Sequence, residues 1–147
     1  TCAVPDLALN GNASSTGAQY QYNWTTPDGN IVSGGTSLQP VVDEPGVYTL
    51  EVFDSGNNCT VTSQVEVFQD TVSPDLDILD PDLLTCAVQE IDLDATPSSS
   101  GPNFTYAWST LDGDIVAGGN TTEPTVADPG TYELLVTNTD NGCATVQ

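Results

Sequence analysis

The stretch YQYNWTTPDGNIVSGG at residues 20–35 returns as FTYAWSTLDGDIVAGG at residues 104–119, which lies 84 positions further along the chain. Sliding the whole sequence by this offset aligns it without a gap, and 26 of the 63 overlapping positions are identical. Self-similarity at a fixed period is the sequence signature of a repeat architecture. The 147 residues therefore hold one whole repeat and most of a second. We expect either a window on a longer tandem array or a missing strand that a neighbouring molecule supplies.

Aromatic residues alternate with polar ones at the start of the repeated stretch, and period-two spacing places them on one face of a strand. The alternating aromatics are Tyr20, Tyr22 and Trp24 in the first copy and Phe104, Tyr106 and Trp108 in the second. Alternation also predicts strands at residues 7–9, 48–52 and 61–67, and at 91–93 and 132–136. The strand at 61–67 is expected in the first repeat only.

Turn residues separate these short strands. Asp28-Gly29 and Asp112-Gly113 are predicted to be hairpin turns, because glycine tolerates the positive φ that such turns need. Short alternating strands broken by Gly, Pro and Asn, without a helical segment, predict an all-β fold built as β-sandwiches. Tyr48 and Tyr132 each follow a Pro-Gly pair and are predicted to form tyrosine corners, in which the phenol hydroxyl bonds back to the preceding loop. Core tryptophans, Trp24 and Trp108, also fit an immunoglobulin-like plan.

Several short motifs of the second repeat carry a family resemblance. They are Leu84-Thr85-Cys86, Tyr106-x-Trp108, Asp112-Gly113-x-Ile115-Val116-x-Gly118, Pro129-Gly130-x-Tyr132 and Asn141-Gly142-Cys143. Their pattern resembles the Ig-like or PKD-like tandem repeats of very large secreted or surface proteins of gliding and marine bacteria. The resemblance implies two tandem immunoglobulin-like (PKD-like) antiparallel β-sandwich repeats with a period of 84 residues, used as extracellular stalks, fibres or adhesins. It implies no catalytic residue.

We expect three parts along the chain. Repeat 1 occupies residues 1–69 and lacks its first strand. Residues 70–84 form an acidic linker, rich in Pro and Asp, together with the first strand of repeat 2. Repeat 2 occupies residues 85–147 and lacks its last strand.

The composition excludes whole classes of function. The chain has 21 Asp and Glu, no Lys, Arg, His or Met, and a formal net charge of −21. Nucleic acids and anionic lipid surfaces are bound through cationic side chains, which are absent. Catalytic triads and zinc sites that need His are excluded because the chain has no His, and a P-loop is excluded because it has no Lys. No apolar run approaches the roughly 20 residues that span a bilayer. We therefore expect no nucleic-acid partner and no membrane insertion.

Four cysteines occur in two sets with the same internal spacing. We expect one disulfide in each repeat, Cys2 with Cys59 and Cys86 with Cys143, although sequence alone cannot choose among the three possible pairings. The main alternative joins Cys59 to Cys86 across the linker and leaves Cys2 and Cys143 to pair with neighbouring molecules. Either pattern implies an oxidising compartment, and hence an extracellular or cell-surface location.

The linker gathers five aspartates: Asp70, Asp75, Asp77, Asp80 and Asp82. They form either a solvated acidic linker or a Ca²⁺ site between the repeats, since calcium takes six to eight oxygen ligands. Asp70-Thr71-Val72 resembles the O-glycosylation acceptor of the same bacterial group. This resemblance makes Thr71 a candidate glycosylation site. Asn-x-Ser/Thr triplets, each a weak signal, mark five further candidate glycosylation sites, at Asn12, Asn23, Asn58, Asn103 and Asn120.

These observations favour a structural module over an enzyme. We expect a non-catalytic repeat of an extracellular fibre, filament, stalk or adhesin, whose partners are copies of itself or adjacent repeats. Such a module polymerises covalently as a tandem array or by strand exchange. The alternative is a carbohydrate- or ligand-binding β-sandwich module of a secreted protein, with surface glycans as partners. It would need exposed aromatic platforms, and Phe53 and Phe68 are the outward-facing candidates. A glycosidase would need paired carboxylates in a cleft, which the sequence does not suggest.

Overall fold

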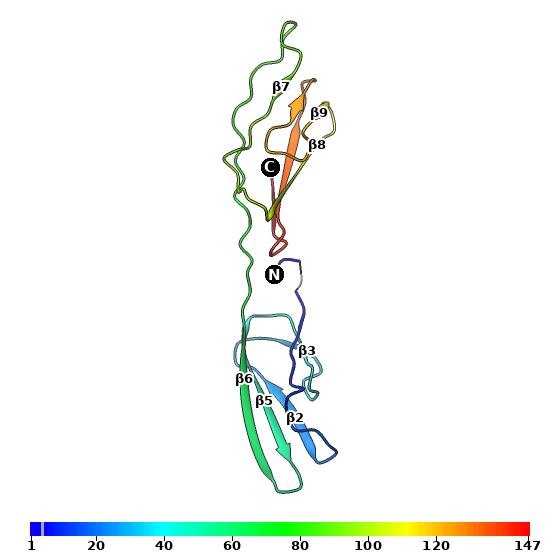
Figure 1. The fold of residues 1–147 in the computed structure, drawn as a ribbon, viewed down its shortest axis with the longest axis vertical. Helices are drawn as coiled ribbons and strands as arrows, with labels where there is room; N and C mark the ends of the chain where they lie inside the picture. Colours follow the sequence, from blue (N-terminus) through cyan, green and yellow to red (C-terminus); the bar gives the residue numbers. More distant parts are fainter. Residues whose placement is uncertain (4) are drawn as a thin grey trace. The chain divides into compact units, whose positions relative to one another are not determined.

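The computed structural model describes residues 1–3 and 5–147, and all regular elements among them are β-strands (Figure 1). In the first half these are β1 (Leu7–Ala8), β2 (Tyr20–Thr25), β3 (Ile31–Ser33), β4 (Val41–Val42), β5 (Gly46–Asp54) and β6 (Cys59–Val67). In the second half they are β7 (Ile91–Asp92), β8 (Phe104–Thr110), β9 (Ile115–Ala117), β10 (Thr125–Val126), β11 (Tyr132–Asn138) and β12 (Ala144–Val146). The described part of the chain contains no helix long and apolar enough to cross a bilayer.

The chain divides into two compact units. The N-terminal unit is Val4–Asp70, and the C-terminal unit combines Thr1–Ala3 with Thr71–Gln147. Each unit holds two three-stranded sheets: β1-β4-β3 and β2-β5-β6 in the N-terminal unit, and β7-β10-β9 and β12-β11-β8 in the C-terminal unit. Every strand pair is antiparallel. The fold is therefore all-β with antiparallel sheets, an arrangement consistent with a β-sandwich.

The two units repeat the same pairing register. Trp24 on β2 lies opposite Leu50 on β5, and Trp108 on β8 lies opposite Leu134 on β11. Both tryptophans are buried, at 7% and 8% exposure. Around them the N-terminal core gathers Leu9, Val42, Tyr48, Leu50 and Val52, and the C-terminal core gathers Leu93, Ala95, Val126, Leu134 and Val136. The alternation of aromatic and polar residues thus places the aromatic face of each strand inward.

Each unit contains a tyrosine that bonds back to the loop before it. The Tyr48 hydroxyl donates to the Glu44 carbonyl at 2.7 Å, and the Tyr132 hydroxyl donates to the Asp128 carbonyl at 2.6 Å. Tyr48 is fully buried, whereas Tyr132 is half-buried. β6 pairs with β5 as far as Gly46 and places Val65 opposite Tyr48, while β12 pairs with β11 over Leu135, Val136 and Thr137.

The Asp-Gly turns differ from the hairpins that we expected. The Asp28-Gly29 turn connects β2 to β3, which belong to different sheets, so it is a crossover between layers. Gly29 does not have a positive φ; it is needed because a Cβ there would collide with the hydroxyl of Tyr48. Asp28 fixes the turn by accepting the Val47 amide at 3.0 Å. The second repeat builds the same turn with Gly113 against Tyr132.

The late strand is present in both units, and not in the first alone. It is the long β6 in the N-terminal unit and the short β12 in the C-terminal unit. The segment Ala144–Val146 lacks the alternating valines by which the strand of the first repeat was recognised, but β12 still pairs with Leu135, Val136 and Thr137 of β11.

Candidate functional site

The feature that distinguishes the two units is a groove along one edge of the core, which is filled in the C-terminal unit. The segment that follows β6 runs extended beside this core. Leu76 and Ile78 pack against the buried cluster that contains Trp108, while Asp75 and Asp77 are exposed. Apolar residues therefore face the core and aspartates face solvent, as in a strand, although the segment carries no regular strand assignment.

Two serines hold the middle of this segment in place. The Asp75 amide donates to Ser99 Oγ at 2.9 Å, and the Ser99 amide donates to the Asp75 carbonyl at 3.0 Å. The Asp77 amide donates to Ser98 Oγ at 3.0 Å, and the Ser98 hydroxyl donates to the Asp77 carbonyl at 3.0 Å. The Ser98 hydroxyl both accepts and donates, and at Ser99 the hydroxyl accepts while the amide donates, so the two serines substitute for backbone ladder partners along the segment.

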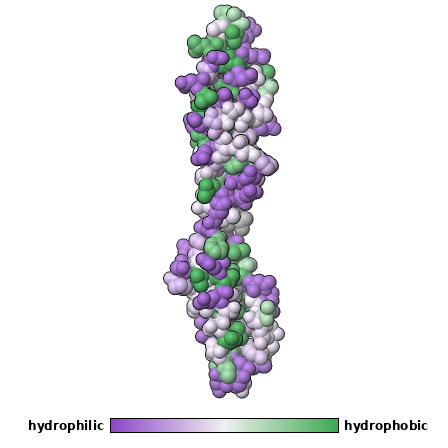
Figure 2. Space-filling model, turned by 60° about the vertical axis from the view of Figure 1, so that its left-hand side comes forward, coloured by the Kyte–Doolittle hydropathy of each residue, from purple (hydrophilic) through white to green (hydrophobic). Residues whose placement is uncertain are grey.

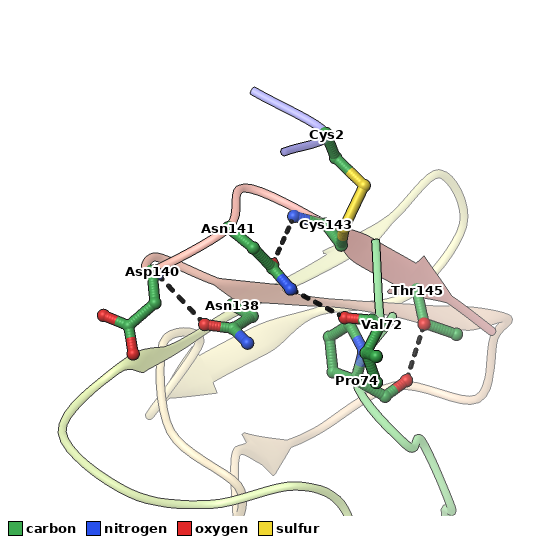
Figure 3. Close-up of a disulfide and its surroundings, with 8 residues drawn as sticks. All are labelled: Cys2, Val72, Pro74, Asn138, Asp140, Asn141, Cys143 and Thr145. Carbon is green, nitrogen blue, oxygen red and sulfur yellow. Dashed lines mark hydrogen bonds between the residues drawn. A yellow bond between two sulfur atoms is a disulfide. The ribbon is translucent and has the colours of Figure 1, made fainter. Parts of the chain in front are cut away.

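The two ends of the segment are fixed as well, and Figure 3 shows the contacts of the end that holds Val72 and Pro74. Asn141 Nδ2 donates to the Val72 carbonyl at 2.9 Å, and Thr145 Oγ1 donates to the Pro74 carbonyl at 2.7 Å. Pro74 is buried. At the far end the Leu79 amide donates to the Asp94 carbonyl at 2.8 Å. Residues 72–79 are thus anchored along their whole length on the C-terminal unit.

A disulfide covers the turn before β12. Cys2 is bonded to Cys143, and the Ala3 amide donates to the Asn141 carbonyl at 3.2 Å (Figure 3). This pairing differs from the bridges within each repeat that we expected. Figure 1 shows the reason: in the C-terminal unit, the segment around residues 80–90 (green) lies at the end opposite the turn between β11 and β12 (red). Cys86 is accordingly free, and Cys2, which folds with the C-terminal unit, is the partner of Cys143.

The remaining cysteines, Cys59 and Cys86, are free and exposed. Cys59 occupies the same kind of turn as Cys143. The Cys59 amide donates to Asn57 Oδ1 at 2.9 Å, as the Cys143 amide does to Asn141 Oδ1 at 2.9 Å. Asn141 and Cys143 are buried, whereas Asn57 and Cys59 are exposed. The turn therefore forms in both units. In the C-terminal unit Cys2 and Ala3 cover it, whereas in the N-terminal unit it is exposed.

In the N-terminal unit the same edge is open. Two adjoining cavities of about 200 and 220 Å³ lie along it, each bounded by core residues and by β6. Their walls are formed by Leu9, Asn10, Gly11, Ala13, Ser14, Ser15, Trp24, Leu50, Val52, Val61, Thr62, Ser63, Gln64 and Val65. We call this the open groove. None of these wall residues is charged, although the chain carries a net charge of −21.

Exposed apolar side chains accompany the open groove. Val61 and Val65 on β6 are 66% and 41% exposed. Figure 2 shows hydrophobic patches (green) that interrupt the polar surface of the lower unit, which is the N-terminal one. Thr145, the counterpart of Val61 in the other repeat, is half-buried under Pro74. Uncovered valines on a strand edge are features that proteins usually pair or cover.

The acidic linker does not gather into a metal centre in the described part of the chain, where no three acidic or Cys side chains lie close enough to hold an ion. Of the linker aspartates, Asp75 and Asp77 lie on the solvent side of the anchored segment, and Asp70, Asp80 and Asp82 are also exposed. One carboxyl elsewhere is perturbed: hydrogen bonds from the Thr96 hydroxyl and amide lower the pKa of Asp94 below its ordinary 3.8.

The candidate glycosylation positions lie mostly on the surface. Thr71, Asn12, Asn23, Asn58 and Asn120 are exposed. Asn103 is half-buried, and its amide donates to Asp140 Oδ2 at 3.1 Å. Asn58 has a positive φ of 59° in the turn before Cys59. The five exposed positions are accessible to a modifying enzyme, and Asn103 is the least accessible of the set.

Aromatic side chains do not form a platform on the described surface. Phe68 is 80% exposed, and Phe53 and every other described aromatic are half-buried or buried. No protein-family model matches this chain, and no curated protein matches it in sequence. Sequence reasoning missed the serine pair that anchors the extended segment. Its signal was present, because Ser14-Ser15 and Ser98-Ser99 are identical in both repeats.

Proposed function

We propose that this chain is a non-catalytic structural repeat module of an extracellular fibre, filament, stalk or adhesin, in which adjacent repeats complete one another. One observation carries the proposal: a continuous piece of chain serves both units. Its first part, β6, is the last strand of the N-terminal unit, and its continuation, residues 72–79, fills the edge of the C-terminal unit. A chain organised in this way extends by adding repeats, because each repeat supplies the segment that the next one needs.

Further features support an exposed location. The Cys2–Cys143 bond is compatible with an oxidising compartment such as the cell exterior. The absence of Lys and Arg leaves trypsin-like proteases no cleavage site, and the net charge of −21 disfavours collapse of chains onto one another. The motifs that resemble tandem surface repeats of gliding and marine bacteria agree with such a location.

Immuno-electron microscopy on intact source cells tests the proposal. Antibodies raised against the 147-residue chain should label filaments or stalks at regular intervals outside the cell. Mass analysis of the labelled material after reduction then separates the two modes of polymerisation. A polypeptide of many repeats indicates a covalent array, and a single short chain indicates strand exchange. Label confined to the cell interior, or turnover of a substrate by the purified chain, would overturn the proposal.

A further inference from the structure

The open groove of the N-terminal unit and the filled groove of the C-terminal unit are built from equivalent residues. Leu9, Trp24 and Leu50 in the open groove stand 84 positions before Leu93, Trp108 and Leu134. These three counterparts belong to the cluster on which Leu76 and Ile78 pack. The open groove therefore presents the same apolar floor without the side chains that cover it in the other unit.

The polar contacts of the open groove are also preformed. The Ser14 amide donates to the Gly11 carbonyl at 2.9 Å, and the Ser98 amide donates to the equivalent Ala95 carbonyl at 3.0 Å. Tyr22 donates to the Ser15 carbonyl at 2.9 Å, as Tyr106 does to Ser99 at 2.8 Å. Within the described residues no hydrogen bond reaches the hydroxyl of Ser14 or Ser15. The backbone of Ser14 and Ser15 thus makes the same contacts as the backbone of Ser98 and Ser99, which anchor a segment in the other unit.

From this equivalence we propose that the open groove binds an extended segment of a neighbouring repeat, with aliphatic residues at alternate positions separated by aspartates. This inference rests on the proposed function and names the partner of its joining site. The bound segment lies as residues 72–79 lie in the C-terminal unit. Two of its aliphatic side chains pack on Trp24 and Leu50, and the backbone of two of its residues forms hydrogen bonds with Ser14 and Ser15. Binding of an extended segment to a sheet edge is a recurring mode of recognition.

Charge agrees with this occupant. The wall of the open groove is uncharged, and it carries Asn10 where the filled groove carries Asp94. The aspartates of the bound segment face solvent, as Asp75 and Asp77 do, so no carboxylate is buried. The partner is nevertheless acidic, like the chain itself. Repulsion between them is screened by salt, so binding is expected to strengthen as ionic strength rises.

The course of the chain also indicates that the bound segment comes from a neighbouring repeat. The chain leaves β6 at Val67 and reaches the buried Pro74 on the other unit after a short connection. A repeat placed before this chain would deliver its own continuation of β6 to the open groove by the same connection. One contact changes, because Val61 stands where Thr145 donates to Pro74, so the open groove lacks that hydrogen bond.

A synthetic peptide supplies the test. The probe is a fluorescent copy of residues 72–80, VSPDLDILD, added to the oxidised 147-residue chain, and its control is VSPDDLLID, which has the same composition without the alternation. We expect saturable one-to-one binding of the probe, tighter at higher sodium chloride concentration, and a rise in the melting temperature of the N-terminal unit. The control peptide should bind at least about tenfold more weakly, because only alternation places both aliphatic residues on the groove.

Variants of the chain locate the site. Ser14→Ala should weaken probe binding about fivefold through loss of a hydrogen-bonding group, while Ser98→Ala, its match in the filled groove, should leave probe binding unchanged. Ser63→Trp, on the groove wall, should abolish binding while circular dichroism remains that of the parent chain. No saturation by about 1 mM probe, equal binding of the two peptides, or equal effects of the two serine variants would overturn the inference. The cell-surface labelling does not depend on these results, so the two proposals fail separately.

Discussion

Cys2 is bonded to Cys143, so a residue near the start of the first repeat closes the end of the second. The two cysteines are 141 positions apart in sequence but belong to one compact unit, because Thr1–Ala3 fold with the C-terminal unit. The chain therefore passes between the units twice, once after Ala3 and once after Asp70.

The first prediction concerns this disulfide. Cys2→Ser should destabilise the C-terminal unit by about 2–4 kcal/mol, because closing a long loop removes entropy from the unfolded chain. A loss of this size lowers the melting temperature by at least about 8 °C for a unit of this length. Differential scanning calorimetry of the variant and of the reduced parent chain measures it. The matched control is Cys59→Ser with Cys86→Ser, which should melt like the parent. Peptide mapping that finds Cys2 or Cys143 bonded to Cys59 or Cys86 would contradict this pairing.

The second prediction compares the two tyrosine corners. Tyr48→Phe should cost about 1–3 kcal/mol, because the Tyr48 hydroxyl is buried and its loss leaves the Glu44 carbonyl without this donor and the Asn30 amide without this acceptor. Tyr132→Phe should cost less, because Tyr132 is only half-buried and water can replace the hydroxyl. Chemical denaturation of the two variants gives the comparison. Equal losses, or a greater loss in Tyr132→Phe, would mean that burial does not set the value of this hydrogen bond.

The strands and the core could be predicted from sequence because they depend on local periodicity. Alternation at Tyr22 and Trp24 fixes which side chains face inward, whatever sheet the strand joins. The offset of 84 then transfers each assignment to the second repeat. The sheet to which a strand belongs could not be predicted in this way. Asp28-Gly29 looks like a hairpin in sequence, but Tyr48 packs on the glycine and directs β3 into the other sheet.

The disulfide could not be predicted, because equal spacing of cysteines in two repeats suits a bond within each repeat and a bond between repeats equally well. The choice depends on which ends of a unit Cys86 and Cys143 occupy, and this follows only from the assembled sheets. The open groove is a similar case. Ser14-Ser15 is visible in both repeats, but its role appears only where residues 72–79 bind the equivalent pair.

The third prediction tests the alternation of the anchored segment. Ile78→Ala should destabilise the C-terminal unit by about 1–3 kcal/mol, because the side chain is half-buried on the core and leaves a space there. Asp77→Ala, the neighbouring position on the solvent side, should change stability by no more than about 0.5 kcal/mol. Thermal melts followed by near-ultraviolet circular dichroism separate the two outcomes. A larger effect at Asp77 would place the segment in the opposite register.

The fourth prediction concerns pH. Hydrogen bonds from Thr96 hold the pKa of Asp94 below 3.8, so the folded state favours the carboxylate. A carboxyl whose pKa is lower in the folded state stabilises the fold above the unfolded value, and this contribution disappears as the pH falls through the lowered pKa. The difference in stability between the parent chain and Asp94→Asn should therefore be constant above about pH 4 and shrink below it.

The first repeat indicates that the Asp94→Asn variant will fold. It has Asn10 at the equivalent position, whose Oδ1 accepts the Asn12 amide at 3.0 Å. Urea denaturation of both proteins at a series of acidic pH values measures the difference. A difference that grows below pH 4 would have the wrong sign and would show that the Thr96 bonds do not stabilise the charged carboxylate.

The fifth prediction concerns ions. With 21 acidic side chains and no Lys, Arg or His, the folded chain repels itself, and sodium chloride should raise its melting temperature by screening. Calcium chloride at matched ionic strength separates screening from a specific site. A further rise that EDTA reverses, and that Asp75→Asn with Asp77→Asn removes, would support calcium binding by the linker aspartates. Equal curves in the two salts would assign the whole effect to screening, and a fall in melting temperature with sodium chloride would contradict the charge argument itself.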